Sequence, residues 1–234
     1  MNLKKIQKKM IIFFNFLKPH ASLKKVIKNS GIILSGNIVS NIFGLLSLSI
    51  FTKSQGAELF GYYIIFLVFL EFIDKLFYFQ TWQAFIKFAS DFQARNENHN
   101  IAMLLKFSFL IELISSILAA IVAFYLSSFA LDFFNIPEKY HMALLFILLT
   151  FLFKITEVSI GIFRFFDRFD LQAKIGVYSS AIKFVMFSFI FLFFPSFEFF
   201  VYATVLSQFI TSMIKFFYVI KILNENKITL FQIF

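Results

Sequence analysis

Six apolar segments, each about 20 residues or longer, constrain this chain more than any other feature. They occupy residues 31–51, 60–79, 101–125, 141–163, 171–194 and 197–222. A helix rises about 1.5 Å per residue, so each segment is long enough to cross about 30 Å of hydrocarbon. The segments are continuously apolar and lack the period-2 alternation of membrane β-strands. The sequence therefore predicts an all-α, polytopic membrane bundle with six transmembrane helices.

The composition points the same way. Hydrophobic residues make up 60% of the 234 residues and charged residues only 15%, whereas soluble domains have about 45–50% and about 25%. There is no Cys, so disulfides and thiolate metal sites are excluded. The net charge of +9 does not indicate a nucleic-acid partner, because much of it lies in residues 1–28, beside the first apolar segment. That arrangement is typical of a cytoplasmic segment in contact with anionic membrane lipids.

Positive charges in the short connections predict the orientation, since Lys and Arg are enriched on the cytoplasmic side. The connection after the second segment carries Lys87 and Arg95, and the connection after the fourth carries Arg164, Arg168 and Lys174. The connections on the opposite side of the membrane carry only Lys53 and Lys139. Both termini are therefore expected in the cytoplasm. We divide the chain into a basic cytoplasmic or interfacial N-terminus (1–29), a six-helix transmembrane lobe (30–223) and a cytoplasmic tail (224–234).

Several apolar segments carry charged residues near mid-depth, where each costs about 2.5–3.5 kcal/mol on insertion scales. Glu71 and Lys75, at i and i+4, and Lys154 and Glu157, at i and i+3, have two open interpretations: pairing within one helix, or lining a cavity. Glu112 and Lys183 have no partner at that depth on their own helix, so they must face a neighbouring helix or water.

Uncharged polar residues also gather on single helix faces. For Ser, Gly and Thr, helix–helix packing is the favoured interpretation, whereas for Asn37, Asn41 and Gln208 a hydrated cavity is at least as well supported. Several helices with one polar face each predict a bundle around an aqueous path. The predicted cavity residues are Asn37, Asn41, Glu112, Lys154, Glu157, Lys183 and Gln208.

Two segments outside the apolar runs are amphipathic. In residues 81–92, Trp82, Phe85, Ile86 and Ala89 share one face opposite Gln83, Lys87 and Asp91. This pattern predicts an interfacial helix or an extension of the preceding span. In residues 163–170, we expect ion pairs between Arg164 and Asp167 and between Asp170 and Lys174.

The chain shows no signature of covalent chemistry. It has no HExxH, GxSxG, phosphate-binding loop or GxGxxG motif, and its three His residues lie in the basic N-terminus, a connection and a segment end. Glu71 and Asp74, at i and i+3, are disfavoured as metal ligands because Lys75 is adjacent and no His is near. We therefore expect a protein that is not an enzyme, without a catalytic residue, a metal or a cofactor.

Three stretches resemble the oligosaccharide flippases of the multidrug/oligosaccharidyl-lipid/polysaccharide exporter superfamily. Residues 56–63, Gly-Ala-Glu-Leu-Phe-Gly-Tyr-Tyr, resemble the signature G-x-E-x-F-G-x-Y. Residues 80–87 are similar to the family's segment after the second span, and residues 161–170 to its G-I-L-R-x-x-x-R-F segment. The candidate motif residues are Trp82, Gln83, Lys87, Arg164, Asp167 and Arg168.

The resemblance implies translocation of a lipid-linked oligosaccharide, such as an undecaprenyl-diphosphate glycan for O-antigen or capsule, across the bacterial inner membrane. It also implies a fold of two six-helix lobes around a cavity whose basic residues face the diphosphate. This chain covers one lobe, so we expect a second six-helix half. A truncated gene or a split transporter is favoured over a homodimer. The alternatives in function are a small-molecule exporter of the same superfamily and a membrane scaffold that does not transport.

Overall fold

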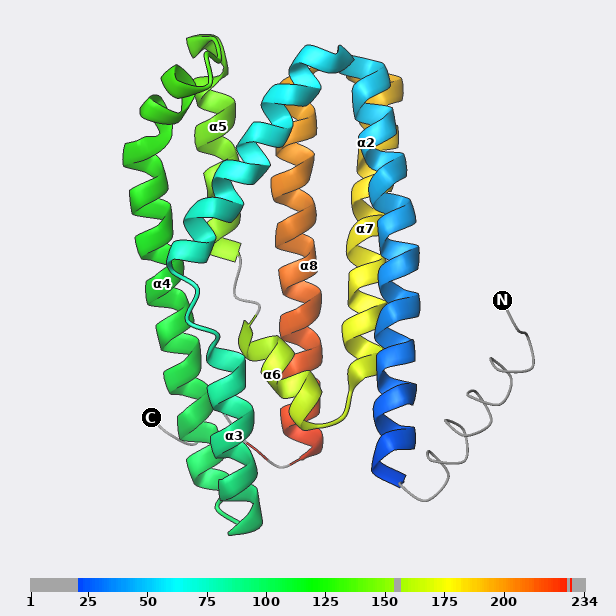
Figure 1. Cartoon of the computed structure of the whole chain (residues 1–234), viewed down its shortest axis with the longest axis vertical. Coiled ribbons are helices and arrows are strands. Elements are labelled where there is room, and N and C mark those ends of the chain that lie inside the picture. The colour runs from blue at the N-terminus through cyan, green and yellow to red at the C-terminus, as the bar shows by residue number, and fades with distance from the viewer. Residues whose placement is uncertain (1–20, 154–156, 227, 229–234) are drawn as a thin grey trace, which may run out of the picture.

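The computed structural model describes residues 21–153, 157–226 and 228 (Figure 1). All of its regular secondary structure is helical within these residues. The elements are α2 (Ala21–Leu76), α3 (Thr81–Ala94), α4 (Asn98–Phe133), the 3₁₀ turn η1 (Glu138–Tyr140), α5 (His141–Leu148), the 3₁₀ turn η2 (Leu149–Phe153), α6 (Glu157–Phe165), α7 (Phe169–Phe193) and α8 (Phe197–Glu225).

Among the described residues, five segments are long and apolar enough to cross a membrane. They are Leu23–Leu76, Asn98–Phe133, Glu138–Phe165, Phe169–Phe193 and Phe197–Glu225. The apolar runs predicted from the sequence at 31–51 and 60–79 are the two arms of α2. The two arms are helical up to Gly56, so the connection between them is shorter than the interval between the predicted runs, residues 52–59.

Gly56 is the point at which α2 bends. Its φ of 81° lies in the region that glycine adopts at no steric cost. Figure 1 shows the first arm rising along the bundle and the second arm descending from the bend at a different angle. The beginning of α2, the α3–α4 connection, the α6–α7 turn and the end of α8 all lie at the other end of the bundle, the lower end in Figure 1.

The first arm of α2 packs along α7 in the most extensive helix–helix contact of the fold. The approach is close, because a Cβ atom on Gly36 would lie 2.7 Å from the Cβ of Ala173. Farther along, the rings of Phe43 and Phe184 lie 5.6 Å apart. The Gly36–Ala173 contact joins small residues at close range, as is usual between membrane helices.

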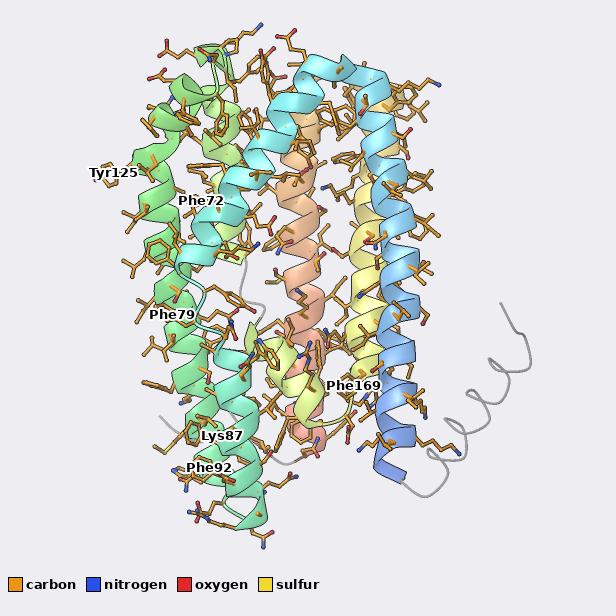
Figure 2. The ribbon with its side chains drawn as sticks, viewed as in Figure 1. Phe72, Phe79, Lys87, Phe92, Tyr125 and Phe169 are labelled. Carbon is orange, nitrogen blue, oxygen red and sulfur yellow. The ribbon has the colours of Figure 1, made fainter. Side chains whose placement is uncertain are left out.

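Aromatic side chains fill the core below the bend of α2. Phe51 stacks on Tyr63 at 4.7 Å, and both rings contact Phe187. Phe200 contacts the rings of Phe51 and Phe187. All four side chains are fully buried. Other aromatic side chains point away from the bundle, as Phe72 and Tyr125 do in Figure 2. Outward apolar side chains of this kind suit a lipid environment.

The apolar run at 141–163 lies in a segment long and apolar enough to span a membrane, as predicted, but it is not a regular α-helix throughout. Helix α5 gives way to η2 at Leu149, and α6 begins at Glu157. The Ser116 hydroxyl donates to the Phe151 carbonyl and the Ser212 hydroxyl to the Phe153 carbonyl. Backbone groups that leave a helix at membrane depth need such partners. Periodicity cannot reveal them, because they come from distant helices.

The last two helices were predicted closely. Helix α7 ends at Phe193, two residues before Pro195, as the sequence indicated. Helix α8 begins at Phe197, and the hydroxyl of Ser196 accepts a hydrogen bond from the Phe199 backbone N–H at 3.4 Å. A serine before the first helical turn is a favoured cap. Helix α4 is longer than the predicted 101–125 at both ends.

Candidate functional site: a polar cavity between α2, α7 and α8

A cavity of about 660 Å³ lies between the second arm of α2, η2, α7 and α8. Its volume is within the range of about 300–1,000 Å³ that is usual for small-molecule sites. The lining is mixed, with four charged side chains and several hydroxyl and amide groups. The residues are Leu67, Leu70, Glu71, Asp74, Lys75, Tyr78, Thr150, Phe151, Ser179, Lys183, Thr204, Ser207 and Gln208.

The cavity lies at the level where a bilayer would be most apolar. Helix α7 has 25 residues and is therefore about 37 Å long. Lys183 lies near its middle, and Gln208 lies near the middle of α8. Of the cavity residues predicted from sequence, these two line this cavity, which is formed by helices distant in the chain.

Lys183 contacts aromatic rings. Its Nζ lies 5.5 Å from the ring centre of Tyr63 and 5.3 Å from that of Phe187. Both distances are within the range of about 6 Å over which a ring attracts a cation. Within the described part of the chain, Lys183 forms no ion pair. Its positive charge is therefore held by ring faces at the wall of the cavity.

Acidic groups lie on the side of the cavity formed by α2. Glu71 Oε1 and Lys75 Nζ are 2.8 Å apart, so the predicted pairing within one helix is confirmed. Both side chains also line the cavity, together with Asp74. The two open interpretations of this pair are thus compatible, because the pair forms and still faces the cavity.

Glu112 lines a second, smaller cavity of about 50 Å³, which shares Asp74 and Tyr78 with the larger one. Its side chain is buried, and its carboxylate accepts a hydrogen bond from the Val158 backbone N–H at 3.2 Å. Val158 is in the first turn of α6. A carboxylate at a helix N-terminus is stabilised by the unpaired N–H groups and the helix dipole. Glu112 therefore anchors α6, as well as lining the small cavity.

The remaining predicted cavity residues are placed differently. Asn37 and Asn41 are exposed on the first arm of α2 and line neither cavity. Lys154 lies outside the described residues. Glu157 is the first residue of α6, and its side chain is outside the described part of the structure.

The two motifs at 80–87 and 161–170 pack against each other through α3 and α6. The Arg164 guanidinium lies 4.3 Å from the ring centre of Trp82. A Cβ atom on Gly161 would lie 2.9 Å from the Phe85 ring, so only glycine allows this approach. Residues 81–94 form a separate helix with Phe85 and Ala89 buried, as its amphipathic pattern predicted. Gln83 and Lys87 lie on its exposed face.

Charged residues after α6 link three helices. Asp167 pairs with Lys25 of α2 instead of the expected Arg164, which lies over Trp82. Arg168 Nε is 3.2 Å from Asp170, and its Nη1 is 3.9 Å from Glu225 at the end of α8. The expected pair between Asp170 and Lys174 is confirmed at 3.7 Å.

Sequence reasoning missed Tyr63 and Thr204 as residues of the site. Their hydroxyl oxygens are 2.8 Å apart, which connects α2 to α8 beside Lys183. A signal existed for Tyr63, because it is the last residue of the motif at 56–63. Thr204 was recognised only as part of a polar helix face.

Comparison with known proteins gives limited similarity. The chain is 29% identical over 157 residues to the inner membrane protein YghQ of Escherichia coli K12, an alignment that covers 65% of this chain and 43% of YghQ. The chain thus spans less than half the length of this relative. No family model matches the chain, and no solved structure matches it. The helices and this similarity identify a helical membrane protein.

Proposed function

We propose that this chain is one lobe of a translocator that flips a lipid-linked oligosaccharide across the bacterial inner membrane. The observation that carries the proposal is the polar cavity of about 660 Å³ near the middle of α7 and α8, with Lys183 in its wall. Packing alone does not require a polar cavity at this depth, where unpaired polar groups are costly. A molecule whose polar part must cross the membrane does require one.

The lining suits the polar part of such a lipid. Lys183 supplies a positive charge for a phosphate group, and charge-assisted hydrogen bonds of this kind are the stronger ones. Gln208 supplies an amide group, and Thr204 and Ser207 supply hydroxyl oxygens that can accept hydrogen bonds from sugar hydroxyls. The lipid chain would remain in the bilayer, so the cavity needs to hold the head group alone.

The topology that we propose has six crossings with both termini in the cytoplasm. The two arms of α2 make the first two crossings, and the other four segments make one each. The basic connections predicted to be cytoplasmic all lie at the end of the bundle where α2 begins and α8 ends (Figure 1), which supports this orientation. We propose that a second helical half, from another chain or a second copy, completes the transporter.

Flipping in proteoliposomes tests the function. The chain is reconstituted together with the second helical half, or as two copies, with a fluorescent undecaprenyl-diphosphate sugar, and a membrane-impermeant quencher reports how fast the probe changes leaflet. Lys183→Ala should slow flipping about tenfold or more, since a hydrogen bond to a charged group contributes about 1.5–3 kcal/mol. Lys139→Ala is the matched control, because Lys139 Nζ also lies over a tyrosine ring, 4.8 Å from Tyr140, but outside the cavity.

A cellular assay complements this one. In a strain that requires the protein for surface glycan, Lys183→Ala should abolish glycan display at normal protein levels. Equal flipping by Lys183→Ala and the unsubstituted protein would contradict the proposal and favour a membrane scaffold. Transport of small solutes without flipping of the lipid probe would favour a small-molecule exporter.

A further inference from the structure

We propose that Tyr63 is the positioning residue for Lys183, holding its ammonium group at the cavity wall so that it binds an anion there. This inference rests on the proposed function in that the anion would be the phosphate part of the lipid-linked substrate. Tyr63 does not line the cavity. It acts through Lys183, which does.

A chain of hydrogen bonds fixes the Tyr63 ring. Thr204 Oγ1 donates its proton to the Phe200 carbonyl at 3.0 Å. A threonine hydroxyl has a single proton to donate, so in the 2.8 Å contact between Tyr63 and Thr204 it is Tyr63 that donates. The ring is thereby fixed to α8, and donation by its hydroxyl increases the electron density of the ring face.

Neighbouring aromatic side chains also hold the Tyr63 ring in place. Phe51 stacks against Tyr63 at 4.7 Å and an interplanar angle of 23°. Tyr63 is fully buried, so it has no freedom to turn away from Lys183. Phe187, one helical turn after Lys183 on α7, supplies the second ring at 5.3 Å. Two ring faces therefore define where the ammonium lies.

The ring contact holds the Lys183 ammonium without cancelling its charge. A ring face attracts a cation without neutralising it, whereas a carboxylate would form an ion pair that competes with a bound anion. Lys183 forms no ion pair among the described residues, although Glu71 and Asp74 line the same cavity. Ring contact thus keeps the ammonium in place and leaves its charge for a ligand.

The position of Tyr63 also gives a role to its motif. Gly56 forms the bend of α2, and Tyr63 follows two turns later on the second arm. The bend places this tyrosine against α7 and α8, where Lys183 and Thr204 lie. The motif at 56–63 therefore connects the shape of α2 to the charge of the cavity.

A nuclear magnetic resonance experiment on the purified full chain tests the proposal without a transport assay. Reductive methylation with ¹³C-formaldehyde converts lysines to dimethyl-lysines, which keep their charge. The Lys183 resonance is identified by its loss in Lys183→Arg. Ring currents should shift it upfield of the other lysines, and Tyr63→Leu should reduce that shift. Phe66→Leu is the matched control, because Phe66 is a buried aromatic residue on the same arm of α2 whose ring packs on Phe197, away from Lys183.

Titration with inorganic diphosphate, followed at the same resonance, measures the anion site. We expect Tyr63→Leu to weaken binding on the order of fivefold and Tyr63→Phe, which keeps the ring, to weaken it less than twofold. Phenylalanine analogues with one, two and three fluorines at position 63 should weaken it in graded steps, because fluorine withdraws electron density at nearly constant shape. This series carries the test if Tyr63→Leu does not fold.

The outcomes separate the two proposals. An unchanged Lys183 resonance and diphosphate affinity in Tyr63→Leu would overturn the positioning role. Equal losses in Phe66→Leu would show general packing and overturn it too, as would a Lys183 resonance that does not respond to diphosphate in the unsubstituted protein. If the graded losses appear but the lipid probe is not flipped when the second half is present, the positioning role stands and the proposed function fails.

Discussion

The close approach of α2 and α7 gives a quantitative prediction for Gly36→Ala. The new Cβ would lie 2.7 Å from the Cβ of Ala173 and 3.1 Å from its Cα, whereas carbon atoms pack best at about 3.5–4.0 Å. The obstructing atoms belong to the backbone and to the short side chain of Ala173, so no flexible side chain can move away. Overpacking of this kind costs about 1–3 kcal/mol.

Gly44→Ala is the matched control on the same arm of α2, because a Cβ there has no atom within 4 Å. Both substitutions gain up to about 1 kcal/mol of helix propensity. The propensity gain cancels when the two variants are compared, so Gly36→Ala should be less stable than Gly44→Ala by about 1–3 kcal/mol.

The assay is unfolding in mixed micelles by increasing dodecyl sulfate, followed by circular dichroism. Adding Ala173→Gly to Gly36→Ala should recover part of the lost stability, since it removes the obstructing methyl group. Equal stabilities of Gly36→Ala and Gly44→Ala would refute the helix–helix contact, and so would the absence of any recovery in the double variant.

Three further predictions address other parts of the fold. Replacing Ser116 and Ser212 together by Ala should lower the unfolding free energy by about 1 kcal/mol, at about 0.6 kcal/mol for each membrane hydrogen bond, and Ser128→Ala, at an exposed position on α4, should not. Because the chain has no Cys, single cysteines report topology directly: Lys53→Cys and Lys139→Cys should react with an impermeant maleimide from outside the cell, and Arg95→Cys only after permeabilisation. A double-mutant cycle with Trp82→Leu and Arg164→Met should give a coupling of about 0.5–1 kcal/mol in thermal unfolding, whereas additive effects would contradict the ring contact.

The sequence predicted the all-α membrane architecture because long apolar runs have few other solutions. It also placed α7 and α8 within a few residues, since Pro195 between the two apolar runs is a local stop signal. It did not predict the 3₁₀ turn at Leu149–Phe153, which lies inside a long apolar run. The hydroxyls of Ser116 and Ser212 that accommodate η2 come from α4 and α8, and no local pattern contains them.

In the candidate site, too, the sequence predicted features that depend on one helix and missed those that depend on several. Lys183 and Gln208 were found because a charge or an amide at mid-depth is costly on a single helix. Asn37 and Asn41 satisfied the same rule and yet line neither cavity. A polar residue on one helix shows that a partner or water is needed, but only the packing of the other helices decides where that need is met.

Tyr63 was not predicted as a residue of the site. A tyrosine in an apolar segment is ordinary, since its ring can be buried in a core. Its importance here arises from two residues far away in the chain, Lys183 over its ring and Thr204 at its hydroxyl. The bend at Gly56 brings these groups together by turning the second arm of α2 back along the bundle. The charge of the cavity and the shape of α2 are therefore coupled through one buried side chain, and a change in the bend would change the position of the Lys183 ammonium.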